Sequence, residues 1–188
     1  MAPYRRLRED GVVMDVPGLG QVTLEAPYGW YRSKPIAVPM FSGRPCSFVL
    51  EGYDEDERKD EFHRAIANFL SGTPAVLREA DKPLFRYYKD FEQWWLEDGN
   101  PPIRPSDDPW RHVHFGSDPV VSRRAYGDKG IYISVECECD WEEEHGLQLV
   151  LKNGLRVNKL GGYDGHLTNS DAFADERLEH VIYPERRA

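Results

Sequence analysis

Apolar residues are spaced differently at the two ends of the chain and in its middle. Residues 11–51 hold four short apolar runs separated by turn residues, which predicts two β-hairpins. Their turns are centred on 17–20 and 42–45. Pro35 and Pro39 lack the N–H group that a strand ladder needs, so their strand is expected to lie at an edge or to be irregular.

The middle of the chain has the helical period. Residues 54–71 predict one helix, because apolar side chains recur at i, i+3, i+4, i+7 and i+8 from Phe62 onward. Its acidic beginning is interpreted as a solvated helix start, and Gly72 is expected to follow its end. A second helical region runs to residue 98, and Pro83 is expected to break or kink it. Its apolar stripe is interpreted as core and consists of Leu84, Tyr88, Phe91 and Trp95.

The last third of the chain, residues 110–160, returns to strands. The run 110–115 is predicted as a short strand with Trp110, His112 and His114 on one face. Two histidines at this spacing can bind a metal ion. An exposed polar face is the favoured interpretation, because the neighbouring sequence shows no third ligand.

Residues 131–141 alternate in polarity. Odd-numbered residues are apolar and most even-numbered ones are polar, which predicts a strand with one buried face. Cys137 and Cys139 fall on that buried face. Core packing is favoured over zinc binding there, because C-x-C with one distant cysteine is a weak match to a four-ligand site. The outer face carries a candidate acidic docking strip, formed by Glu136, Glu138 and Asp140.

A third hairpin is predicted over residues 147–160, with the Asn-Gly pair at 153–154 in a type I′ turn. This turn would place Leu147 opposite Leu160. The pairing brings the tract Trp-Glu-Glu-Glu-His-Gly beside the tract Gly-Gly-Tyr-Asp-Gly-His. We therefore expect a cluster of carboxylates and imidazoles at this end of the hairpin. Its candidate members are Trp141, Glu143, Glu144, His145, Asp164 and His166.

This cluster completes no known catalytic motif. HExxH is absent, and the inverted HxxEH pattern fails because Trp141 stands at its first His position. The phosphate-binding GxxxxGK[ST] loop and the G-x-S-x-G elbow are absent too. A structural or recognition role is favoured over catalysis. Whether the chain is an enzyme is left open, and a protein without enzymatic activity is preferred. A divalent cation held by 143–145 and 164–166 is the alternative, and no other cofactor is expected.

Charge narrows the classes of partner. The chain has 24 Lys and Arg against 33 Asp and Glu, a net charge of −9. Nucleic acid is not an expected partner, because phosphate contacts need clustered cations. No apolar run approaches the roughly 18 residues of a membrane helix, and three cysteines make no disulfide framework. We expect a cytoplasmic protein that suits a basic protein partner.

One part of the sequence is similar to a known family. The tract CECDWEEEHGLQLVLKNG, followed by VNKLGGYDGHLTNSDAF, resembles a family of uncharacterised bacterial proteins over residues 131–173. The resemblance implies an α+β domain of bacterial, intracellular origin, and it brings no established activity. Small acidic proteins of this kind occur among toxin-neutralising immunity proteins, which is an analogy only. The residues that match the family pattern are Trp141, Glu142, Glu144, His145, Gly146, Asp164, Gly165 and His166.

These patterns predict a single α+β domain over residues 1–188. Residues 161–188 are expected to wrap as loops, with a strand at the run His-Val-Ile-Tyr. The chain is expected to be a non-enzymatic protein-binding module. Its more specific expected role is to neutralise a toxin. A metal-dependent enzyme or metal-binding module is the alternative, and the oligomeric state is left open. The expected layout is antiparallel strands in 11–51, two central helices in 54–98 and a C-terminal β-meander in 110–160.

Overall fold

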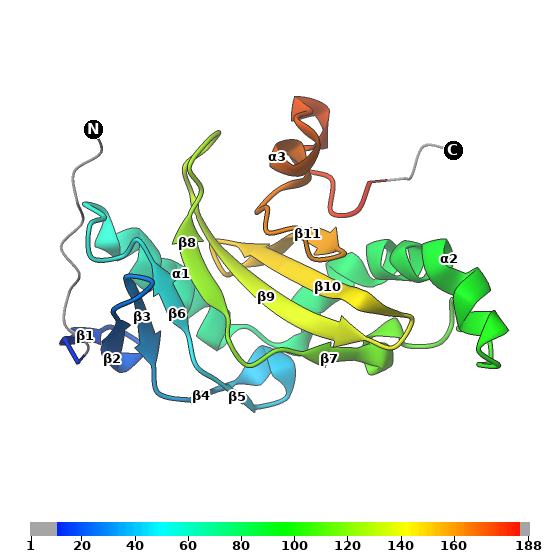
Figure 1. The fold of residues 1–188 in the computed structure, drawn as a ribbon, viewed down its shortest axis with the longest axis horizontal. Coiled ribbons are helices and arrows are strands. Elements are labelled where there is room, and N and C mark those ends of the chain that lie inside the picture. Colours follow the sequence, from blue (N-terminus) through cyan, green and yellow to red (C-terminus); the bar gives the residue numbers. More distant parts are fainter. Residues whose placement is uncertain (1–10, 185–188) are drawn as a thin grey trace.

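The structure, a computed structural model, describes residues 11–184 of the chain. The basic segment 1–10, where the sequence shows no apolar signal core, lies outside the described residues, as do residues 185–188. The fold is α+β, with a long and mostly antiparallel sheet. Figure 1 shows α1 behind the sheet and α3 beyond β11. The predicted fold class is therefore confirmed.

The main sheet has the strand order β1-β2-β3-β6-β8-β9-β10-β11, and β7 also pairs with β9. Only β6 and β8 run parallel, because the helices of the middle third separate them. A separate two-stranded sheet joins β4 and β5. The strands are β1 Val13–Val16, β2 Gly20–Glu25, β3 Trp30–Ser33, β4 Ile36–Val38, β5 Arg44–Cys46, β6 Val49–Glu51, β7 Val113–Phe115, β8 Val120–Arg123, β9 Ile131–Cys139, β10 Glu142–Lys152 and β11 Arg156–Gly161.

The two N-terminal hairpins are confirmed in different degrees. β1 and β2 pair antiparallel around the predicted turn. The second prediction is wrong in extent, because β4 pairs only with β5, and β6 leaves the hairpin to join the main sheet. A short 3-10 turn, Pro39–Phe41, shortens the hairpin strand, and Pro39 stands at its first position. β3 had no counterpart in the sequence prediction.

The two central helices are confirmed with different boundaries. α1 spans Lys59–Ser71 and α2 spans Asp81–Glu97, preceded by the 3-10 segment Pro74–Ala80. α1 starts later than predicted because Asp56 accepts a hydrogen bond from the Arg58 N–H and pairs with Arg123 of β8 at 2.5 Å. This interaction holds the preceding acidic residues in a turn against the sheet.

Pro83 does not break α2. It is the third residue of the helix, within the first turn, where the N–H groups have no intrahelical partner. The predicted apolar stripe packs inward from this point: Leu84 and Tyr88 are fully buried, and Phe91 and Trp95 are half-buried against the core.

The predicted C-terminal meander is present as β8, β9, β10 and β11. Odd-numbered residues of β9 are buried, as the alternation predicts, and Glu136 and Glu138 are exposed. Tyr132 departs from this parity and is fully buried on the outer face. Its hydroxyl donates to Asp128 at 3.1 Å, and the Lys152 ammonium lies 5.7 Å from its ring centroid.

Two local predictions in this region are wrong. The predicted strand at 110–115 begins only at Val113, because Pro109 and the Asp108 side chain, which accepts from the Trp110 N–H at 3.2 Å, form a 3-10 turn. The hairpin register also differs: Leu160 pairs with Leu149, not Leu147. The loop has three residues instead of two, and a bulge between Val150 and Leu151 shifts the ladder once more.

The C-terminal segment folds back across the β11 end of the sheet (Figure 1). It contains α3 Asn169–Phe173 and the 3-10 turn Glu176–Leu178. The expected strand at 180–183 is not formed, although the Leu160 N–H donates to the Ile182 carbonyl at 2.8 Å. The Asn169 amide instead donates to the two carbonyls of Val181 and Ile182.

One hydrophobic core lies between α1, α2 and the inward face of the sheet. It includes Phe62, Phe69, Leu84, Val135 and Leu149. Across residues 11–184, no helix is long and apolar enough to cross a bilayer.

Candidate functional site

The turn from β9 into β10 builds the site. Glu142 pairs with Cys139, and Leu147 pairs with Cys137. Between these two pairs β10 advances by five residues and β9 by only two. The extra residues bulge out of the ladder. Gly146 permits this bulge, because its φ is +57° and a Cβ atom there would lie 2.5 Å from the Cys137 carbonyl oxygen.

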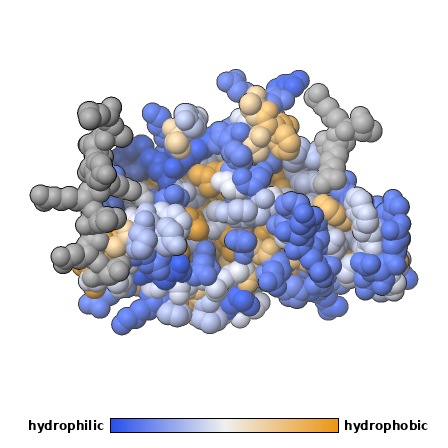
Figure 2. All heavy atoms as spheres, in the orientation of Figure 1, coloured by the Kyte–Doolittle hydropathy of each residue, from blue (hydrophilic) through white to orange (hydrophobic). Residues whose placement is uncertain are grey.

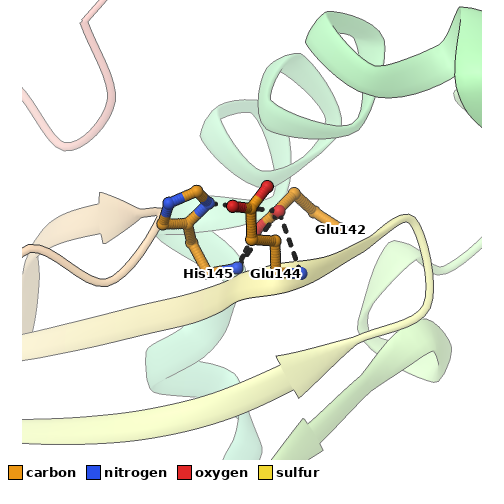
Figure 3. Close-up of side chains that lie close together, drawn as sticks. All are labelled: Glu142, Glu144 and His145. Atoms are coloured by element: carbon orange, nitrogen blue, oxygen red, sulfur yellow. Dashed lines mark hydrogen bonds and ion pairs between the residues drawn. The ribbon is translucent and has the colours of Figure 1, made fainter.

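The bulge wraps around the carboxylate of Glu142 (Figure 3). The backbone N–H groups of Glu144 and His145 donate to this carboxylate at 3.1 and 2.9 Å. The His145 Nδ1 lies 3.4 Å from it, and the Tyr87 hydroxyl of α2 lies 3.3 Å from it. Only 5% of the Glu142 side chain is exposed, so the carboxylate is held in a buried position by backbone donors.

The two tracts that the sequence predicted to meet do meet. The Tyr163 N–H donates to the His145 carbonyl at 3.2 Å, and Gly162 lies beside the His145 side chain. Their charged side chains nevertheless separate. Asp164 and His166 pair with each other at 3.3 Å, whereas His145 pairs with Glu142.

Lys159 explains why Asp164 turns away from His145. The Lys159 side chain is 2% exposed, and its ammonium contacts the Asp164 carboxylate and donates to Gln148 Oε1 at 2.7 Å. The His166 carbonyl accepts from the same ammonium at 3.2 Å. Burial lowers the pKa of Lys159 below its ordinary value, and the Asp164 charge opposes this shift. The predicted cluster is therefore two separate groups.

A cleft of about 950 Å³ joins these groups at the β11 edge of the sheet. One wall is α2 and the other is the C-terminal segment, with β10 and β11 between them. Polar and aromatic side chains both line it, which is typical of ligand sites. The polar lining residues are Arg86, Glu142, His145, Lys159, Asp164, Asn169 and Asp175, and the aromatic ones are Tyr87, Phe91, Tyr163, Phe173 and Tyr183.

The other candidates of the predicted cluster lie outside this cleft. Trp141 is buried and packs its ring against Tyr87 and Tyr88 at 6.2 and 5.7 Å between centroids. Its Nε1 has no hydrogen-bond partner within the described chain. Glu143 and Glu144 are exposed on the bulge. Trp141 is therefore a core residue of the site region.

The acidic strip is exposed, but its third member, Asp140, is paired with two histidine rings. Asp140 accepts from the His112 ring at 2.9 Å and lies 2.6 Å from the His114 ring. The two histidines therefore have a carboxylate between them that alternation alone did not reveal. The histidine contacts lower the pKa of Asp140, although burial opposes the shift. Glu136 and Glu138 remain as the open carboxylates of the strip.

Metal ligation has one geometric candidate among the described residues. Glu142, Glu144 and His145 offer ligand atoms that all lie within 4.8 Å of one another. Cys137 and Cys139 belong to no such group among the described residues, and burial raises the pKa of both thiols to about 12. All three cysteines are buried and free.

Three residues of the cleft escaped sequence reasoning. Strand parity assigns Glu142 to the solvent face, although the resemblance to the family pattern includes it. Tyr87 stands next to the predicted helix stripe and was not assigned to it. Lys159 lies within a strand where a charged residue is expected to face water, so no local signal marks it as buried.

Comparison with known proteins supplies the family. Neither a curated protein nor a solved structure matches this chain. A family model described as a domain of unknown function, DUF6985, matches residues 18–167. The matched region contains the β9–β10 bulge, the acidic strip, Lys159 and Asp164. The chain therefore belongs to the DUF6985 family, whose function is not known.

Proposed function

We propose that the chain is a non-catalytic binding protein for a basic protein partner, and that neutralisation of a toxin is the specific role. The docking surface would be the sheet face that points away from α1 and α2. The supporting observation is a set of exposed carboxylates without a cation on that face: Glu51, Glu136 and Glu138. No described Lys or Arg pairs with any of these three.

Glu51 lines a hollow of about 430 Å³ on this face, together with Ser134, Gln148 and Tyr163. Arg123 lines it too, and this guanidinium is already paired with Asp56 and Glu61. Burial raises the pKa of the Tyr163 phenol, and the charges of Glu136, Asp164 and Glu51 raise it further. Tyr163 therefore lies near the negative charges of Glu51 in β6, Glu136 in β9 and Asp164 in the loop after β11. Such a field favours and steers a basic partner.

The surface around this hollow has the mixed character of a protein interface. Figure 2 shows a largely hydrophilic face with apolar side chains over its middle and near α3. Tyr163 and Phe173 are exposed large side chains on this part of the chain. Aromatic residues inside a polar surround are typical of binding surfaces.

A matched pair of triple variants tests the proposal. Glu51→Gln, Glu136→Gln and Glu138→Gln together remove three charges from the proposed surface. Asp15→Asn, Glu57→Gln and Asp98→Asn remove three exposed charges elsewhere. Capture from the native host should yield a basic protein at low salt with the wild type and the control, and not with the surface variant. The captured protein should be toxic when expressed alone, and co-expression of this chain should restore growth.

Two results would contradict this function. One is the absence of any captured basic protein at low salt. The other is equal capture by both triple variants, which would show that net charge and not this surface attracts the partner.

A divalent-cation site is the second candidate, supported by the convergence of Glu142, Glu144 and His145. Three ligands are the set that many catalytic metal sites provide. Elemental analysis of the purified chain and thermal shifts with Mn²⁺ and Zn²⁺ test it. Binding should disappear in Glu144→Gln and His145→Ala, and no metal with no thermal shift would remove this candidate.

A further inference from the structure

We infer that the cleft between α2 and the C-terminal segment receives an arginine side chain of the basic partner, with Glu142 as the counter-ion. This inference rests on the proposed function and identifies the chemical group that the partner inserts. It uses a different part of the surface from the acidic strip, so the two can be tested separately.

Glu142 is a buried carboxylate without a cation. Its side chain is 5% exposed, and its only ionic partner among residues 11–184 is the exposed His145 at 3.4 Å. Neither Arg86 nor Lys159, the two described cations that line the cleft, forms an ion pair with it, and Lys159 pairs with Asp164. A buried charge is costly unless a counter-ion compensates it. The Glu142 carboxylate in the cleft therefore favours the binding of a cation from outside the described chain.

The carboxylate also retains acceptor capacity. Two oxygens provide about four acceptor positions. The firm donors are the N–H groups of Glu144 and His145. The Tyr87 hydroxyl has one proton, and the Gly146 carbonyl at 2.7 Å attracts it more strongly than Glu142 Oε2 at 3.3 Å. A guanidinium could therefore donate to Glu142 without displacing an existing donor.

The wall beside Glu142 is aromatic. Tyr87, Phe91 and Tyr183 all line the cleft. Tyr87 packs against Phe91 at 5.2 Å and against Tyr183 at 5.5 Å between ring centroids, both in edge-on geometry. A guanidinium is planar and weakly hydrated, and it stacks on aromatic faces more readily than an ammonium does. The combination of a carboxylate with aromatic walls therefore favours arginine over lysine.

The cleft adjoins the hollow on the acidic face. Tyr163 lines both the 950 Å³ cleft and the 430 Å³ hollow. A basic partner that docks on the acidic face therefore lies beside the cleft mouth. The partner could insert one side chain there while its other cations face Glu136 and Glu138.

N-acetyl-argininamide is the probe for this inference, and N-acetyl-citrullinamide is its neutral isostere. NMR chemical-shift titration of the full chain should show the arginine probe binding at His145, Tyr87 and Tyr183 with a dissociation constant on the order of 1 mM, as befits one side chain. The citrulline probe should bind at least about tenfold more weakly, since it lacks the charge. This comparison uses the wild-type chain and so does not depend on the folding of a variant.

Variants locate the binding site. Glu142→Gln should weaken the arginine probe about tenfold, whereas Glu143→Gln, the same change one residue away and outside the cleft lining, should leave binding unchanged. Equal binding of the two probes, or no shifts at the cleft with the arginine probe, overturns the inference. So does an unchanged affinity in Glu142→Gln.

The same variants separate this inference from the proposed function. If Glu142→Gln binds the captured partner as wild type does and the surface triple variant does not, the cleft inference fails and the docking surface stands. If the arginine probe binds and no basic partner is captured, the cleft site stands without the proposed function.

Discussion

Arg124 and Glu142 are two buried charges that the fold treats in opposite ways. The Arg124 side chain is 4% exposed and pairs with Asp171 at 2.7 Å and Glu179 at 2.5 Å. Asp128 lies 3.5 Å from the same guanidinium. Glu142 is as deeply buried, and its ionic partner is the exposed His145 ring at 3.4 Å, with no Lys or Arg among the described residues. The first charge has more than full compensation from side chains of the chain, and the second has backbone N–H donors and one exposed imidazole.

The difference separates a structural charge from a site. Arg124 joins the end of β8 to the C-terminal segment, and that segment forms one wall of the cleft. Its carboxylate partners all belong to the chain, so the folded protein compensates the Arg124 charge without a ligand. Glu142 lines the same cleft and is held mainly by backbone N–H groups, with the His145 ring and the Tyr87 hydroxyl at longer distances. In the inference above, the arginine side chain of the partner supplies the cation that Glu142 lacks.

The largest expected effect is at Arg124. Arg124→Met leaves Asp171 and Glu179 without their cation and should lower the free energy of unfolding by about 3 to 5 kcal/mol. Urea unfolding at pH 7 measures this loss. Arg177→Met, which removes an exposed arginine paired with Asp175, is the control and should unfold like the wild type. A small loss at Arg124 would mean that the C-terminal segment is held by apolar contacts.

Low pH should weaken the ion pair between Arg124 and Asp171. The Arg124 hydrogen bond lowers the pKa of Asp171 below its ordinary value, and burial opposes this shift. A carboxyl whose folded pKa is lowered stabilises the fold above the unfolded pKa, near 4, and loses that contribution as pH falls through its folded pKa. Urea unfolding of the wild type should therefore show stability falling below about pH 4. Arg124→Met should show a shallower fall, and equal slopes would contradict the assignment.

Substitution of Lys159 should lower the free energy of unfolding by less than substitution of Arg124 and by more than substitution of Glu142. Its ammonium is buried, but its partner Asp164 is 37% exposed and can be hydrated when the lysine is removed. Lys159→Met should therefore lower the free energy of unfolding by only about 1 to 2 kcal/mol. Thermal unfolding against Lys34→Met, an exposed lysine, measures the difference. A loss as large as that of Arg124→Met would show that Asp164 has no access to water.

The smallest effect is expected at Glu142. Glu142→Gln removes an uncompensated buried charge and keeps an oxygen that accepts from the bulge N–H groups, so stability should change by less than about 1 kcal/mol. Urea unfolding beside Glu144→Gln provides the measurement. A loss of several kcal/mol would make Glu142 a structural residue like Arg124, and the contrast between the two charges would disappear.

Much of the fold could be predicted because its signals are local. The stripe of α2 and the alternation of β9 are periods within one element, and burial follows them. The β1–β2 hairpin depends on a nearby turn. The parallel pairing of β6 with β8 could not be predicted this way, because it joins strands that two helices separate.

The candidate site was predicted in position and not in composition. The two tracts meet at the end of the β10–β11 hairpin, and pairing of neighbouring strands is enough to bring them there. Which side chains face one another was not predictable. The bulge after Glu142 reverses strand parity, and Lys159 draws Asp164 away from His145.

The sequence by itself determined the types of most elements, the buried faces of α1, α2 and β9, and the neighbourhood of the site, since each follows from residue period and chain proximity. Only the tertiary structure decided that Glu142 and Lys159 are buried, that Arg124 holds the C-terminal segment, and that a cleft opens beside β11. Burial of a charge depends on which distant segments pack around it. The free energy of that packing belongs to the whole fold and leaves no local pattern in the chain.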